Sequence, residues 1–410
     1  MALSLRTYDS LTQLEALRPA WEELLSNYPP ATTFSTWEWL SSWWSCFGRN
    51  RRLLVLALFD SGRIVGLAPL SISAERLGWF WFRVLRLMGD GSNDSDNLDV
   101  PVLPGYESAF AESVLTYLRQ HKREWDICQL NTLPLASPGV SCLIELLRST
   151  SWTFWERLSD TWAVELPDSW DLYSQILLSE DRKNLVRYMR RLQTRHSVRT
   201  YRCSDASHLP VCLDALFRLH QGRWQNVGQS GTFSSSERRE FYAQLSRNLL
   251  ARGWLELWVL ELEGEIAAVQ FAFRYRDRVF QLQEGYDHRR SSDRLGFVLR
   301  GHVLKQLIEE KVRTYDFLGG EDPYKKRWGA RESHYLQLEF SPRFGLGSAW
   351  LHFVHKADRS KEWLRQTLPA STWSVLHKMN VYLRGSKQTE KSDSASATDK
   401  FDEKAAGLQV

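Results

Sequence analysis

The chain has 410 residues, of which 43% are hydrophobic and 25% are charged, and its formal net charge is +4. This composition is typical of a globular protein, the length favours two domains, and so small a charge does not by itself indicate nucleic-acid binding. The five cysteines are odd in number and none has C-x-x-C spacing, which argues against a disulfide framework or a zinc ribbon and favours a reducing compartment. Because no secretory signal and no apolar run of about 18 residues is visible, we expect a cytoplasmic protein without a transmembrane segment.

The first half of the chain alternates between apolar residues at helical spacing and short runs typical of strands. In chain order we expect a strand over 4–8, helices over 11–25 and 34–46, a hairpin of strands over 53–59 and 64–73, a strand over 83–88, a helix over 107–120 and a strand over 126–131.

The second half repeats this order, and capping serines and a glycine mark the ends of its helices more clearly. We expect a strand over 199–204, a helix over 209–224, a helix capped by serines at 234–236 and ended by Gly253, strands over 254–262, 266–275 and 279–286, a helix over 296–311, and strands over 313–318 and 334–340. Tight turns join the three middle strands, so they should be antiparallel. Two more helices are expected over 350–363 and 372–384. The Ser-, Lys- and acid-rich segment from 386 to 410 is expected to be disordered.

The most informative stretch is 315–330, YDFLGGEDPYKKRWGA. A strand-like run ends in Gly319 and Gly320, and paired glycines permit a tight turn or the close approach of a ligand. The polar loop that follows carries two acids, three bases and two aromatic residues before Gly329. Loops at strand ends often hold functional groups, so we expect a site here, with a solvated surface loop as the plain alternative.

A strand, Gly-Gly and then Tyr-Lys-x-x-Trp-Gly resembles the signature of CelD-like (BioF2-like) acetyltransferases, a branch of the GNAT superfamily related to the Fem-type peptidyltransferases. Segments 34–48, 187–192 and 221–233 are similar to other parts of that family, so the resemblance covers about 34–340. The resemblance implies a GNAT-like α/β fold with a mixed sheet. The repeated order of elements, and that order alone, predicts two such domains in tandem. The expected divisions are 1–165, which lacks the glycine loop and shapes the cleft, a catalytic domain over 166–345, a helical extension over 346–385 and the tail over 386–410.

The resemblance implies acetyl-CoA or another acyl-CoA as the donor, bound where the fourth and fifth strands of the second domain splay apart. The exposed strand would pair with the pantetheine arm, and the N-terminus of the next helix would receive the pyrophosphate. The connecting loop, DHRRSSDRLG, departs from the usual glycine-rich pattern. The residues expected to bind the donor are Tyr286, Arg289, Arg290, Ser291, Ser292 and Gly296.

Direct acyl transfer needs a base for the nucleophile, a donor for the oxyanion and an acid for the departing thiolate. Glu284 in the fourth strand and Asp316 in the fifth are the candidate bases. Tyr324 could protonate the thiolate, and Lys325 could neutralise the oxyanion or a substrate phosphate; the resemblance favours both positions. Asp316 could equally be a structural partner of Lys325 or Arg327. No hydrolase triad and no metal-ligand spacing is visible, so we expect no metal.

A helix expected to begin at Ser179 carries an uninterrupted set of basic residues. The segment 182–202 holds eight basic residues and no acid, and several of them recur on one helix face. The face is either simply solvated or binds an anion such as a sugar nucleotide, a CoA, an acidic polymer or nucleic acid. The residues expected to contact substrate are Lys183, Arg187, Arg190, Arg191, Gly319, Gly320 and Trp328.

The chain contains 19 tryptophans, with clusters at 37–44 and 79–81. Tryptophan buries much area and needs only one hydrogen-bond partner, so these clusters most simply pack the cores and the seam between the domains. A carbohydrate-stacking platform and a membrane-facing patch are the alternatives.

Together these patterns predict an acyl-CoA-dependent N- or O-acyltransferase that transfers directly to an amine or hydroxyl of a sugar or sugar nucleotide. The resemblance implies a place in extracellular polysaccharide or cellulose biosynthesis. One alternative is a Fem-type aminoacyl or peptidyl transferase that acts on a cell-wall precursor and takes charged transfer RNA as its donor. The other is a non-enzymatic protein that binds a polyanion. No DNA partner is expected.

Overall fold

The computed structural model describes residues 3–226, 231–320 and 323–367. The chain falls into two compact units, divided between Ser348 and Ala349. The first unit holds both halves predicted from the sequence. The expected helix over 372–384 and the expected disordered tail over 386–410 lie outside the described residues.

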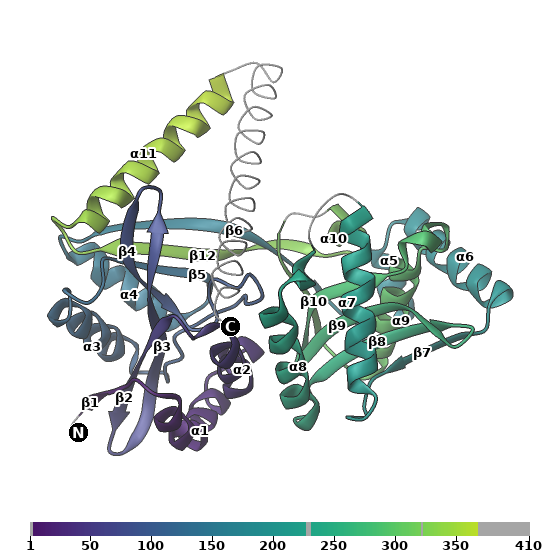
Figure 1. The fold of residues 1–410 in the computed structure, drawn as a ribbon, viewed down its shortest axis with the longest axis horizontal. Helices are drawn as coiled ribbons and strands as arrows, with labels where there is room; N and C mark the ends of the chain where they lie inside the picture. The colour runs from purple at the N-terminus through teal and green to yellow at the C-terminus, as the bar shows by residue number, and fades with distance from the viewer. Residues whose placement is uncertain (1–2, 227–230, 321–322, 368–410) are drawn as a thin grey trace, which may run out of the picture. The chain divides into compact units, whose positions relative to one another are not determined.

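The strands of the first unit form one twelve-stranded mixed sheet in the order β1-β2-β3-β4-β5-β12-β6-β11-β10-β9-β8-β7 (Figure 1). Read from its two ends, the sheet shows β1–β5 and β7–β11 in the same arrangement. In each set antiparallel neighbours lead up to one parallel pair, β4 with β5 and β10 with β11. The strands are β1 (Leu3–Tyr8), β2 (Arg51–Asp60), β3 (Arg63–Leu77), β4 (Phe80–Leu87), β5 (Ile127–Pro134), β6 (Thr153–Glu165), β7 (Val198–Arg202), β8 (Leu255–Leu262), β9 (Glu265–Tyr275), β10 (Arg278–Tyr286), β11 (Thr314–Gly319) and β12 (Arg331–Ser341).

The two halves exchange their last strands at the centre of the sheet. Strand β6 of the first half pairs with β11 of the second, and β12 of the second half pairs with β5 of the first. β6 and β12 also pair with each other, from Arg331 opposite Ala163 to Ser341 opposite Thr153. The halves therefore share a continuous sheet, and the expected boundary at residue 165 stays a prediction.

The helices follow the predicted order, and in the second half the sequence of elements is β7-α7-α8-β8-β9-β10-α9-β11-α10-β12. The fold prediction is thus confirmed as a mixed α/β sheet built from two repeats and followed by a helix. The helices are α1 (Leu11–Ser26), α2 (Trp37–Phe47), α3 (Glu107–Gln120), α4 (Pro138–Ser149), α5 (Trp170–Ile176), α6 (Ser179–Arg195), α7 (Leu209–Asn226), α8 (Ser236–Ala251), α9 (Leu295–Glu309), α10 (Pro323–Arg327) and α11 (Leu346–Thr367), with 3-10 turns η1 (Thr33–Ser35), η2 (Thr232–Ser234) and η3 (His288–Asp293).

Three helices and one strand were not expected. Helix α4 begins after Ser137, whose hydroxyl accepts from the Val140 N–H, and Pro138 occupies its first turn. Helix α5 begins in the same way after Ser169. Helix α10 lies where an irregular loop was expected, and β6 follows α4. None of the described helices has the length and apolarity needed to cross a membrane.

The first tryptophan cluster packs the seam between the halves. Trp39 and Trp43 of α2 are completely buried. The Trp39 ring lies 5.6 Å from Phe241 of α8 and 5.0 Å from Phe273 of β9, measured between ring centroids. The expected role of this cluster in core packing is therefore confirmed, and it fixes the two halves against each other beside the cleft described next.

Candidate active site

The candidate site opens where β10 and β11 part. Their parallel ladder runs only from Arg278 opposite Thr314 to Phe280 opposite Asp316. Beyond it β10 bulges but stays paired with β9, and β11 bulges but stays paired with β6. On the side facing β11, none of the described strands pairs with β10 beyond Phe280, so its backbone groups are free to meet a ligand.

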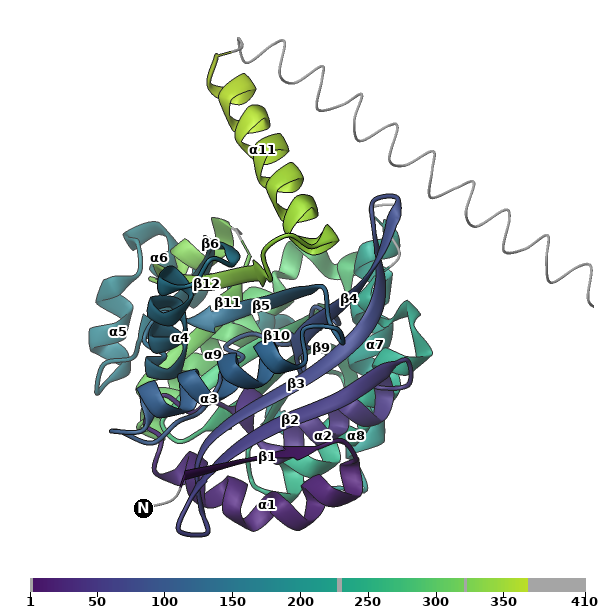
Figure 2. The ribbon, with the colours of Figure 1, turned by 90° about the vertical axis from the view of Figure 1, so that its left-hand side faces the viewer.

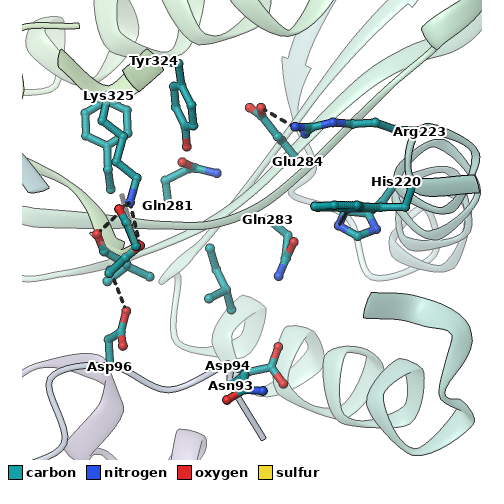
Figure 3. Close-up of a pocket in the computed structure, with 16 residues that line it drawn as sticks. Asn93, Asp94, Asp96, His220, Arg223, Gln281, Gln283, Glu284, Tyr324 and Lys325 are labelled. Carbon is teal, nitrogen blue, oxygen red and sulfur yellow. Dashed lines mark hydrogen bonds and ion pairs between the residues drawn. The ribbon is translucent and has the colours of Figure 1, made fainter. Parts of the chain in front are cut away.

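A cavity of about 370 Å³ fills this opening, and both halves line it (Figure 3). The second half supplies β10, the end of β11, helix α7 and helix α10. The first half supplies the loop between β4 and α3. The lining residues are Asn93, Asp94, Asp96, His220, Arg223, Trp224, Gln281, Leu282, Gln283, Glu284, Phe317, Leu318, Gly319, Gly320, Tyr324 and Lys325. The structure thus brings together five predicted site residues, namely Glu284, Gly319, Gly320, Tyr324 and Lys325.

The Glu284 carboxylate is held in the cavity by two arginines. It forms an ion pair with Arg300, which is almost completely buried, and it lies 3.8 Å from the Arg223 guanidinium (Figure 3). Arg300 was missed in the sequence analysis. A signal was present, because Arg300 is the only Lys, Arg, Asp or Glu in the largely apolar segment 295–304 of helix α9.

Tyr324 packs on the same arginine. The Arg300 guanidinium lies 4.6 Å from the centroid of the Tyr324 ring, and the rings of Phe317 and Trp328 lie on it at 5.7 and 5.8 Å. Cation–π contacts of this kind hold a ring in place when the site is shielded from water. The Tyr324 hydroxyl points into the cavity opposite Gln281 (Figure 3).

Lys325 closes the turn at the end of β11. Its buried ammonium donates to the carbonyls of Leu318, Gly319 and Gly320 at 2.9, 2.6 and 2.9 Å. Leu318 has a φ of +61° and Gly320 a φ of +92°, so the turn needs this support. A catalytic role for Lys325 stays a prediction, and these contacts favour a role in positioning the turn.

Two carboxylates brace the same turn from the other side. Asp316 accepts from the Leu318 N–H at 2.8 Å, and Asp96 of the first half accepts from the Gly319 N–H at 2.9 Å. Burial raises the pKa of Asp316 to about 6 and also raises the pKa of Asp96. Asp316 is not among the residues that line the cavity, and its contacts favour a structural role. Arg327 instead pairs with Asp181 of α6.

Two polar residues of the cavity wall, His220 and Gln281, are uncharged. Burial lowers the pKa of His220 to about 4, so its imidazole is uncharged near pH 7. Its Nε2 accepts from the Trp224 indole N–H at 3.0 Å, which places the imidazole proton on Nδ1. The Oε1 atom of Gln281 is buried and has no hydrogen-bond partner in the part of the chain that the structure describes. A buried acceptor without a partner points to a polar ligand or a water in the cavity.

The residues expected to bind the donor divide into three groups. Tyr286 continues the free edge of β10, under the Arg223 guanidinium at 5.3 Å, and Gly296 packs directly on its ring. Arg289 and Arg290 instead line a separate cavity with Asp214 and Arg218, and Arg289 is paired with Asp287 at 2.9 Å. Ser291 and Ser292 are exposed in η3.

The basic face of α6 lies beside the start of α9. Arg191 pairs with Asp293 at 3.3 Å, and Arg187 donates to the Tyr188 hydroxyl at 3.2 Å. Hydrogen bonding and charge from Arg187 and Arg294 lower the pKa of Tyr188. Helix α9 begins after Arg294 with no side-chain cap and no acid in its first turn. An anion at this helix end would therefore meet free backbone N–H groups and the guanidinium groups of Arg187 and Arg294.

The remaining expected substrate residues lie away from the cavity. Lys183 and Arg190 are exposed on α6. Trp328 is 1% exposed, packs on Phe297 with ring centroids 4.7 Å apart, and accepts at its carbonyl from the Tyr173 hydroxyl. Its burial favours a core role over contact with substrate.

The sequence analysis also missed the loop of the first half that lines the cavity. The segment 89–97, GDGSNDSDN, supplies Asn93, Asp94 and Asp96. Its Gly, Asp, Asn and Ser content is typical of a loop, and its acids between two apolar segments were the available signal. One group of described residues, Asp160, Glu332 and His334, has ligand-type atoms within 4.8 Å of one another, while the absence of a metal stays a prediction.

Comparison with known proteins supports the GNAT class. Residues 179–326 match the model of a family described as an acetyltransferase (GNAT) domain. This match supports a GNAT-type acetyltransferase domain in the second half of the chain. The CelD-like branch stays a prediction. No curated protein matches the chain.

Two solved structures share the fold. FemX is 11% identical, and the match covers 85% of this chain and 99% of that chain with a TM-score of 0.57. A conserved protein of unknown function from Bacteroides thetaiotaomicron VPI-5482 is 12% identical over 83% of this chain and 100% of that chain, with a TM-score of 0.52. At these identities the likeness concerns the fold alone.

Proposed function

We propose that the protein is a cytoplasmic acyl-CoA-dependent N- or O-acyltransferase whose acceptor is a sugar or sugar nucleotide. The observation that carries this proposal is the cavity between β10 and β11, where Glu284 and Tyr324 face the same space beside a free strand edge. A carboxylate and a phenol across one cavity can serve as the proton acceptor and the proton donor of a single transfer step.

In the proposed reaction Glu284 accepts the proton from the acceptor's amine or hydroxyl as that group bonds to the thioester carbonyl carbon. The bond from that carbon to sulfur then breaks, and the Tyr324 hydroxyl protonates the departing thiolate. Arg300 contacts both side chains, so it fixes their positions relative to each other. Free N–H groups on β10 are available to the carbonyl oxygen.

The donor has a path along the second half. Its amide-rich arm would pair with the free edge of β10 from Gln281 to Tyr286, and its phosphates would reach the start of α9 near Arg187 and Arg294. This assignment differs from the one made on sequence, because Arg289 and Arg290 face another cavity.

The acceptor has a second cavity next to the first. It measures about 680 Å³ and shares Asn93, Asp96, Gly319 and Gly320 with the catalytic cavity. Its lining includes the side chains of Asp90, Asn131, Thr132, Ser159 and Asp160, and no Lys or Arg among the described residues. Hydroxyl, amide and carboxylate groups suit the hydroxyls or the amine of a sugar. We place such a sugar here and, following the resemblance, assign the enzyme to extracellular polysaccharide biosynthesis.

The proposed donor is tested by thermal-shift titration of the whole chain with acetyl-CoA and with free CoA. A ligand that binds only the folded state stabilises it by about 2.7 kcal/mol at a hundredfold excess over its Kd. We expect a saturable shift that the double variant Arg187→Glu/Arg294→Glu loses and the matched double variant Arg289→Glu/Arg290→Glu retains. The reverse pattern would move the phosphates to the other cavity. No shift at millimolar CoA would refute the acyl-CoA donor and leave the Fem-type alternative, with charged transfer RNA as the next ligand to test.

A further inference from the structure

The hairpin of β3 and β4 projects beyond its neighbours in the sheet. β2 pairs with β3 no further than Ser73, and β5 pairs with β4 only at Val84 and Leu85. Beyond those points the two strands pair only with each other in the described ladder, up to Leu77 opposite Phe80. Figure 2 shows this hairpin end extending past β2 and β5. A two-stranded ribbon on its own is marginally stable in water, so we expect a further contact to stabilise this hairpin end.

The tip of the hairpin carries three exposed aromatic side chains. Trp79, Phe80 and Trp81 are 83%, 57% and 69% exposed. This contrasts with the other tryptophan cluster, in which Trp37, Trp39 and Trp43 are buried. The aromatic tip, defined as residues 79–81, therefore has no role in a core and belongs to no cavity described above.

The size of the aromatic tip argues against a stable protein interface. Its exposed aromatic area is roughly 300–500 Å², taking about 150–250 Å² for each whole side chain and the exposed fractions given above. A standard protein–protein contact buries about 800 Å² on each partner. A second copy of the chain meeting it tip to tip would bury too little surface. A wedge of two indoles and a phenyl ring is, however, of the size and chemistry that anchors at the boundary between lipid headgroups and acyl chains.

Charge next to the aromatic tip fits the same surface. Arg76 lies directly opposite Trp81 in the ladder, is exposed, and has no carboxylate partner among the described residues. The chain as a whole also carries a formal charge of +4. A basic residue beside an aromatic wedge is attracted to anionic headgroups. We propose that the aromatic tip inserts into the surface of an anionic membrane and holds the enzyme there peripherally.

The test is co-flotation of the full chain with vesicles of phosphatidylcholine alone and of phosphatidylcholine with phosphatidylglycerol. We expect flotation with the anionic vesicles and at least a fivefold loss of the bound fraction in Trp79→Ser/Trp81→Ser. Arg76→Glu should lower binding to the anionic vesicles only. Leu172→Ser, which replaces a half-exposed residue of α5, is the matched control and should bind like the wild type.

Equal melting temperatures show that the variants are folded. Wild-type protein that stays unbound, or a double variant that floats like the wild type, would overturn the proposal. So would self-association of the wild type without vesicle binding that Trp79→Ser/Trp81→Ser abolishes, because the occupant would then be a second copy.

Discussion

The gap between β4 and β5 and the gap between β10 and β11 are the two copies of one feature. The last paired residues are Leu85 and Cys128 in the first and Phe280 and Asp316 in the second, so the next residues along the strands are Arg86 and Gln281. Arg86 bridges its gap by donating to Gln129 of β5 while it pairs with Glu75 and Asp90. The Oε1 atom of Gln281 is instead buried and has no hydrogen-bond partner among the described residues.

The difference shows that the same backbone geometry can hold a network of paired charges in one copy and an open cavity in the other. A cavity of about 830 Å³ also lies beside Arg86, but the charges of Glu75, Arg86 and Asp90 that face it are paired with one another. In the second copy the arginine comes from helix α9 instead, which leaves the space between the strands open and Glu284 at its edge. The first copy contributes its loop to that space, and its lack of a site of its own stays a prediction.

The largest effect is expected from Glu284→Gln, because the amide cannot accept the acceptor's proton. Loss of a general base typically lowers the rate by about 10²–10⁴-fold. We expect that loss in kcat, measured as thiol release from acetyl-CoA. Glu75→Gln removes the carboxylate that pairs with Arg86 in the first half and should leave kcat within about twofold. Equal losses in both variants would show that the effect is structural.

A large effect on stability is expected from Arg86→Met. The side chain of Arg86 is 13% exposed, and its loss strands Glu75 and Asp90 without their partner. Breaking a buried ion pair from one side costs about 3–5 kcal/mol. Arg83 lies on the same strand as Arg86 and forms a more exposed pair with Asp126, so Arg83→Met should cost less than about 1 kcal/mol. Urea unfolding of the two variants measures the contrast, and similar losses would contradict the proposed network.

A smaller effect is expected from Asp316→Asn and depends on pH. The pKa of Asp316 is raised from 3.8 to about 6, so this group stabilises the fold fully below about pH 4 and less as pH rises through 6. The shift corresponds to roughly 3 kcal/mol at most. Asp316→Asn should therefore reduce the fall in unfolding free energy between pH 4 and pH 7, measured by urea titration. The exposed Asp168→Asn should keep the wild-type pH dependence, and an unchanged dependence in Asp316→Asn would contradict the raised pKa.

The sequence predicted the order of elements because helical and strand periods are local properties. It did not predict the exchange of β6 and β12, since nothing in either strand specifies which half it joins. The sequence does contain one short repeat that relates the two halves. Thr-Phe-Ser opens the second helix of each half, in η1 at Thr33–Ser35 and in η2 at Thr232–Ser234, and a hydroxyl residue that caps the helix follows each time.

The candidate site was predicted in part for the same reason. Glu284, Tyr324 and Lys325 lie on or just after strands that the pattern located, so they could be placed together. Arg300 and the 89–97 loop reach the cavity only through packing between elements distant in sequence. The contacts of Lys325 likewise depend on the φ angles of Leu318 and Gly320, which no periodicity encodes.

The exchanged strands also set a condition on how the chain can fold. β5 ends at Pro134, but its neighbour β12 begins only at Arg331, near the end of the unit. During synthesis the first half therefore waits with an open strand edge until most of the second half has emerged. Pairing over such a sequence separation is slow, and open edges invite association with other chains. The same exchange that builds the cleft from two copies makes completion of the sheet a late and cooperative event.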